Sequence, residues 1–158
     1  MQTEADRWRE RTEQKLRFAE LHLDEVLATD LPGHGHDFER SHLEAVLYQL
    51  VGASDTFKRE LLALAGRRSP LVDRLAAFRN NKTEGLGELV ALRDSSTHSS
   101  GVPLSFYMGS ENDGKVAFKH PDTLVEFPER ATDTLAGWLR TMRALFSELR
   151  EAACAPAE

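Results

Sequence analysis

The sequence is short of the residues from which disulfides, cysteine metal clusters and membrane spans are built. Among its 158 residues there is one cysteine, Cys154, so neither an intrachain disulfide nor a cysteine metal cluster can form. No run of about eighteen apolar residues is present, so no membrane-spanning helix is expected. Residues 1–20 are rich in charge and lack the apolar stretch of a signal peptide. We therefore expect a cytoplasmic protein without a membrane partner.

Proline and glycine are also few, six and ten, and several of them stand where an apolar-periodic stretch begins or ends. Between these breaks, apolar residues recur at helical spacing. Ser69 is expected to cap a helix whose first turn holds Pro70, and Asp37 is expected to cap the helix before it. The pattern predicts five helices, over residues 3–29, 38–65, 70–80, 83–92 and 128–153.

Two short apolar runs, residues 102–107 and 116–119, enclose the turn-forming residues 111–114. This pattern predicts a β-hairpin. Because an isolated two-stranded ribbon is only marginally stable, the hairpin should pack on the helices. The expected fold is therefore mainly α: an antiparallel helical bundle of about five helices with one β-hairpin insertion. The length fits a single domain over residues 1–158, with a flexible tail at about 154–158.

Acidic residues outnumber basic ones, 26 to 20, and the net charge of −6 argues against a protein that coats polyanions. Residues 58–82 depart from this balance, with seven basic residues against two acidic ones, a local charge of +5. Clustered Lys and Arg are what binding to a phosphate backbone requires. An alternative interpretation is a solvated helix face and turn. The residues expected to contact a phosphate backbone are Arg67, Arg68, Arg74, Arg79 and Lys82.

Three histidines, His34, His36 and His42, raise the question of a metal site. A firm zinc site needs three or four converging ligands at suitable spacing. Here two of the histidines lie in a glycine-containing loop and no cysteine assists. We predict no metal site and no cofactor.

Residues 93–98 combine a permanent cation with a group that titrates near neutral pH. Arg93 has a planar fork of donors that matches phosphate oxygens, and His98 can give or take a proton. The chain holds two Arg-His pairs with four to six intervening residues, Arg93/His98 and Arg17/His22. Since about 1.7 such pairs are expected by chance, the spacing alone is uninformative.

Context separates these two pairs. Arg17 and His22 lie inside a long expected helix, where side chains five residues apart point about 140° away from each other. Arg93 and His98 are expected to straddle a helix end, where the chain can turn and bring them together. Arg93 also continues the apolar face of its helix, so it needs a partner, a cleft or a second subunit.

Two long helices, a shorter helical pair ending in residues 93–98 and a final long helix form a layout that resembles the HEPN superfamily. The signature of that family is an Arg, often followed by a polar residue, and then a His after four to six intervening residues. Arg93, Asp94 and His98 stand at these positions. The resemblance implies a metal-independent endoribonuclease that dimerises, commonly a toxin or phage-defence effector, sometimes paired with an antitoxin protein.

The resemblance also implies a role for each of the three residues. Arg93 would stabilise charge on the scissile phosphate, and His98 would transfer a proton during attack by the RNA 2′-hydroxyl. Asp94 would orient the site. Members controlled by a nucleotidyltransferase antitoxin often have a Tyr two residues after the His, where this chain has Ser100.

Three alternatives stay open at this point. Arg93 could pair with Asp94 or Glu88 at a helix end while His98 stabilises the negative helix terminus, without any catalysis. Other HEPN domains are noncatalytic modules for dimerisation or binding. A pocket for a small ligand within the bundle is the third alternative, and no sequence feature names its ligand.

Overall fold

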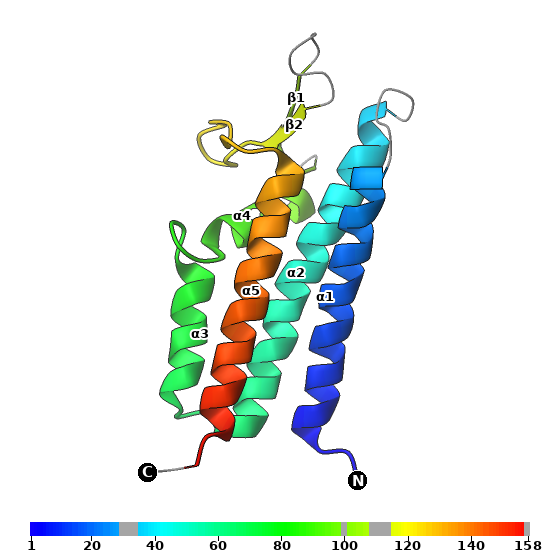
Figure 1. Ribbon diagram of the computed structural model, residues 1–158. Coiled ribbons are helices and arrows are strands. Elements are labelled where there is room, and N and C mark those ends of the chain that lie inside the picture. The colour runs from blue at the N-terminus through cyan, green and yellow to red at the C-terminus, as the bar shows by residue number, and fades with distance from the viewer. Residues whose placement is uncertain (29–34, 99–100, 108–114, 157–158) are drawn as a thin grey trace.

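The computed structural model describes residues 1–28, 35–98, 101–107 and 115–156. Figure 1 shows long helices side by side in antiparallel arrangement, a shorter helix lying across them, and a hairpin at the end opposite the two termini. The expected mainly α bundle of five helices with one β-hairpin is therefore confirmed within these ranges. In chain order the elements are α1 (Glu4–Ala28), α2 (Gly35–Ala65), α3 (Pro70–Asn80), α4 (Gly87–His98), β1 (Leu104–Tyr107), β2 (Lys115–Phe118) and α5 (Ala131–Cys154).

Helix α2 is the centre of the bundle, because it contacts each of the other four helices. Its apolar stripe is removed from water, with Leu43, Leu47, Leu50, Phe57 and Leu61 at most 1% exposed. Phe57 stacks on Phe146 of α5, with ring centroids 3.9 Å apart. Burial of such side chains is the main stabilising contribution of the core. None of the helices in the described ranges has the length and apolar character needed to cross a membrane.

One ionic cluster lies against this core and joins three helices. The Arg150 guanidinium of α5 donates to both carboxylate oxygens of Glu60 on α2, at 2.6 and 2.9 Å, and to Glu13 on α1 at 2.8 Å. Glu60 is only 1% exposed. Burial lowers the pKa of Arg150, but the hydrogen bonds and charges of Glu60 and Glu13 have the larger combined effect. The pKa of Arg150 is therefore raised above its ordinary value. Arg150 therefore stays charged and neutralises a carboxylate that has no access to water.

Helix α3 begins and ends where the sequence predicts. Ser69 is extended at the N-cap and its hydroxyl accepts from the Leu71 backbone N–H, with Pro70 in the first turn. Asn81 forms the C-cap. Helix α2 begins earlier than expected, at Gly35, so Asp37 lies in the first turn and the prediction that it is the N-cap is wrong. A carboxylate in the first turn still stabilises the helix through its dipole.

Replacement of Ser69 by Ala is expected to lower the free energy of unfolding by about 0.5–2 kcal/mol, because an N–H of α3 loses its acceptor. Urea denaturation followed by circular dichroism measures this change. Ser147, an exposed serine inside α5, provides the matched control. Ser147→Ala should leave stability unchanged or slightly raised, since Ala is the better helix former. Equal effects of the two replacements would contradict the capping role.

The hairpin pairs as expected, with Leu104 opposite Phe118 in an antiparallel register. Both residues are buried and belong to the core cluster, so the hairpin packs on the helices. Upstream of it, Val102 donates its N–H to Glu44 at 2.8 Å and accepts from Arg40 at 2.5 Å. These contacts with α2 hold the start of the hairpin. The expected turn residues 111–114, the loop residues 33–34 and the last two residues of the expected tail lie outside the described residues.

Helix α4 differs from its predicted span of 83–92 at both ends. The Asn81 side chain accepts from the N–H groups of Thr83 and Glu84, so the chain makes a turn before the helix begins at Gly87. Gly85 lies so close to α3 that a Cβ there would be 1.9 Å from the Phe78 carbonyl oxygen. At its other end the helix continues to His98. These two shifts decide where the candidate site residues lie.

Candidate functional site

Arg93 and His98 lie on the same helix, so the prediction that they straddle a helix end is wrong. The polar residues between them continue α4, and Thr97 donates its hydroxyl back to the Arg93 carbonyl at 3.1 Å. Residues five apart in a helix point about 140° away from each other. The geometric contrast with Arg17 and His22 on α1 therefore disappears. Within one chain, neither pair converges through the turn of its helix.

Arg93 is half-buried, with 26% of its side chain exposed, and its Nε lies 2.8 Å from the Asp94 carboxylate. The expected need for a partner is thus met by the neighbouring residue in α4. Asp94 is half-exposed, so this contact is a partly solvated ion pair and not a desolvated one. The carboxylate holds the guanidinium in one orientation and leaves its other donors available.

A cavity of about 410 Å³ opens beside Arg93, between α2, α3 and α4. Lys58 of α2 and Arg79 of α3 line it together with Arg93 and Asp94 of α4. We call it the Arg93 pocket. Arg79 also pairs with Asp55, while Lys58 has no ion-pair partner in the described parts of the chain. Three cationic side chains from three helices around one cavity make a suitable environment for a phosphate group.

The structure does not gather all five residues expected to bind RNA into one track. Arg67 and Arg68 are exposed in the turn before α3, whereas Arg79 and Lys82 lie at the other end of that helix. Arg74 pairs with Glu148 of α5 at 2.6 Å, on a different side of α3 from the Arg79 pair with α2. Only Arg79 of this set shares a pocket with Arg93.

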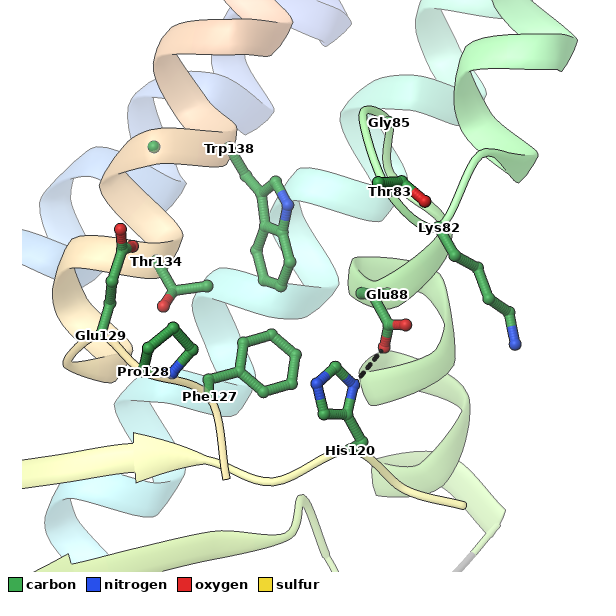
Figure 2. A pocket seen from close by; sticks show the side chains of 11 residues that line it. Lys82, Thr83, Gly85, Glu88, His120, Phe127, Pro128, Glu129, Thr134 and Trp138 are labelled. Carbon is green, nitrogen blue, oxygen red and sulfur yellow. Dashed lines mark hydrogen bonds and ion pairs between the residues drawn. The ribbon is translucent and has the colours of Figure 1, made fainter. Parts of the chain in front are cut away.

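A second cavity, of about 340 Å³, lies between α5, the segment after β2 and the start of α4. Figure 2 shows the ring of Phe127 between those of Trp138 and His120, with Lys82 beyond Glu88 on the side of His120. His120 stacks on Phe127 with ring centroids 4.2 Å apart, and Phe127 meets Trp138 edge-on at 6.3 Å. We call this cavity the aromatic pocket. It combines flat apolar surfaces with a small number of polar groups, as ligand sites do.

His120 is oriented by a carboxylate in this pocket. Its Nδ1 lies 2.9 Å from Glu88 of α4, and both side chains are partly buried (Figure 2). Because an ionised carboxylate can only accept, Nδ1 carries the proton in this contact. Nε2 is then left to accept a hydrogen bond from a ligand, or to donate one when the ring is protonated.

The aromatic pocket has no counterpart in the sequence patterns. Glu88 was considered only as a partner of Arg93, and it pairs with His120 instead. These two residues are 32 positions apart and meet because the segment after β2 passes beside α4. Neither helical periodicity nor motif spacing signals such a contact. Trp138 is visible in the sequence only as an aromatic residue beside the apolar stripe of α5.

The remaining histidines give no metal site within the described ranges, where no group of three or more His, Cys, Asp or Glu side chains is placed to hold an ion. His34 lies outside those ranges. His22 meets His42 across α1 and α2, with Nδ1 atoms 3.3 Å apart. Arg17 and His22 therefore belong to different surroundings from the two pockets.

Comparison of the chain with protein-family models, curated proteins and solved structures finds no match.

Proposed function

We propose that this protein is a HEPN-like, metal-independent endoribonuclease in which Arg93 contacts the scissile phosphate and His98 transfers a proton. The observation that supports this most directly is the Arg93 pocket, where Lys58 and Arg79 join Arg93 around one cavity. RNA cleavage through the 2′-hydroxyl develops negative charge on the phosphate, which such cations stabilise. Asp94 orients Arg93 at 2.8 Å, in agreement with the role that the family resemblance implies.

The proposed site is composite and needs two copies of the chain. Arg93 and His98 point in different directions from α4, so one copy does not bring them to the same phosphate. His98 is exposed at the end of α4 and is accessible to a second copy. In a two-fold symmetric dimer, Arg93 of one copy and His98 of the other would face the same RNA, and two equivalent sites would form.

Sedimentation velocity at tens of micromolar is expected to show a dimer, in the range where even a modest interface is populated. The dimer should persist in His98→Ala, since this residue is proposed to act on RNA and not to hold the copies together. A species that stays monomeric throughout this concentration range would contradict the composite site.

A noncatalytic HEPN-like binding module is the second candidate. It is favoured by the same separation of Arg93 and His98 on one helix, because neither residue needs the other if the Arg93 pocket only binds phosphate. The two candidates differ in one measurement, which is cleavage of single-stranded RNA by wild type and by His98→Ala. Cleavage lost in the variant supports the nuclease, whereas binding without cleavage in both proteins supports the module.

A toxin or phage-defence role, an antitoxin protein as partner and a cytoplasmic location complete the proposal. They rest on the family resemblance and on composition. Co-expression of the chain with candidate antitoxins in a growth assay tests the first two, since a nuclease toxin arrests growth when its antitoxin is absent.

A further inference from the structure

We infer that the aromatic pocket binds a nucleobase of single-stranded RNA whose backbone contacts the Arg93 pocket. This inference deepens the proposed function, and the part of it that concerns RNA rests on that proposal. It assigns a ligand chemistry, a flat heteroaromatic ring carrying a phosphate, to a cavity that has no role in phosphate cleavage.

The shape and lining of the pocket favour a flat ring. Its volume of about 340 Å³ is at the lower end of the roughly 300–1,000 Å³ that small-molecule sites occupy. Phe127, Trp138 and His120 present ring faces and edges from two elements that are fixed by mutual contacts. Unpaired bases bind proteins by stacking on such side chains, because every base has a π face.

The polar groups of the pocket fit the edge of a base and its phosphate. Glu88 holds His120 through Nδ1, which leaves Nε2 to accept a hydrogen bond from an exocyclic amine of a base. Lys82 at the rim supplies a point charge for a phosphate. Glu88 and Glu129 carry the opposite charge, so the lining as a whole does not favour a bare anion.

The two pockets border each other at the connection between α3 and α4. Asn80 lines the Arg93 pocket and Lys82 lines the aromatic pocket. Asn80 and Lys82 are two positions apart in the chain, so the distance between their Cα atoms is at most about 7 Å. The tight connection between α3 and α4, with Gly85 against the Phe78 carbonyl, therefore forms the border between both pockets. Because Glu88 and Arg93 point about 140° apart on α4, a strand of several nucleotides that passes around this connection, and not a single nucleotide, would contact both pockets.

Tryptophan fluorescence tests this inference directly. The chain has two tryptophans, and Trp8→Phe leaves Trp138 as the single reporter. Trp8 contacts Arg11 and Arg59 away from both pockets, and phenylalanine keeps a ring at that position. A short single-stranded purine RNA and free adenosine monophosphate are each titrated into this protein. We expect quenching of Trp138 by RNA, and no quenching by the same RNA with abasic sites.

Binding measured by fluorescence anisotropy of labelled RNA supplies the second readout. Trp138→Ala and His120→Ala should each weaken binding by about 5- to 100-fold, the range for loss of one stacked base. Trp8→Ala is the matched tryptophan control and should bind like wild type. Trp138→Phe should retain most of the affinity, because it keeps both the packing and a stacking face. Circular dichroism checks that each variant is folded.

The outcomes separate this inference from the proposed function. Quenching by RNA alone, or by RNA and adenosine monophosphate together, supports the base pocket. RNA that binds in an Arg93-dependent manner without quenching Trp138 overturns it, whatever the cleavage result. If RNA neither binds nor is cleaved, the proposed function fails. The mononucleotide arm then decides alone: quenching assigns the pocket to a free nucleotide, and no quenching overturns the inference.

Discussion

RNA cleavage is expected to fall by about 10²–10⁴-fold in His98→Ala, the usual contribution of proton transfer by a positioned side chain. Arg93→Ala should lose a comparable factor, because phosphate charge stabilisation by one group is worth about 10²–10³-fold. Both residues lie on the outer part of α4, half-buried or exposed, so neither replacement should unfold the protein. The measurement is a single-turnover cleavage assay on one labelled RNA.

Mixing the two inactive variants gives a sharper test of the composite site. In a dimer of one Arg93→Ala copy and one His98→Ala copy, one site loses both groups and the other site retains both. With random exchange of subunits, half of the dimers are mixed, so activity should return to about one quarter of wild type. A site formed within a single copy predicts no recovery. Failure of the mixture to recover activity while each variant dimerises would contradict the arrangement.

Arg17 and His22 provide matched controls for the same assay. They have the same spacing on α1, and His22 contacts His42 and neither pocket. Arg17→Ala and His22→Ala are expected to cleave like wild type. A chelator should also leave the rate unchanged, since the proposed chemistry uses no metal. Folded Arg93→Ala and His98→Ala proteins that cleave as fast as wild type would eliminate the ribonuclease assignment.

The largest loss of stability is expected from Arg150→Ala, at about 3–5 kcal/mol, the range for breaking a buried ion pair. Glu60 is 1% exposed and would keep neither its charged partner nor access to water. Glu13 would lose its contact with Arg150 as well. Urea denaturation at one fixed protein concentration measures the change, because the stability of the proposed dimer would depend on concentration.

Arg143 is the matched control for Arg150 on the same helix. It pairs with Glu20 at 3.2 Å and with Glu13 at 3.7 Å, but 37% of its side chain is exposed. Arg143→Ala should therefore lose no more than about 1 kcal/mol. Replacing Arg150 by Met together with Glu60 by Leu should restore much of the stability, since no buried charge is left unpaired. Equal losses from the two arginines would contradict the role of burial.

The sequence predicted most helix positions well, because the apolar period of a helix is a local property. Helix α1 was expected over residues 3–29 and spans Glu4–Ala28, and α3 begins after Ser69 and ends before Asn81 as expected. These boundaries depend on neighbours in the chain: a serine that accepts an N–H, a proline in the first turn, an asparagine that ends the helix. The hairpin strands were found for the same reason.

Helix α4 shows where local pattern is insufficient. Leu86, Leu89 and Val90 were expected to face inward; Leu86 and Leu89 are buried, whereas Val90 is only partly buried. Its start depends on the turn made by Asn81 and on the close approach of Gly85 to α3. Its end depends on Ser95, Ser96 and Thr97, which continue the helix, and Thr97 is also hydrogen-bonded to Tyr48 of α2. Because the helix continues past residue 92, His98 lies in the helix and not in a turn. The expected convergence of Arg93 and His98 within one chain is therefore lost.

The sequence by itself determined the class of fold, the inward face of each helix and the position of Arg93 as a charged residue beside an apolar face. Tertiary structure alone decided which side chains meet. Lys58, Arg79 and Arg93 share a pocket because three helices pack there, and Glu88 holds His120 across 32 residues. The physical reason is that periodicity records only whether a side chain faces water or core. Which distant residues face each other depends on how the helices pack together.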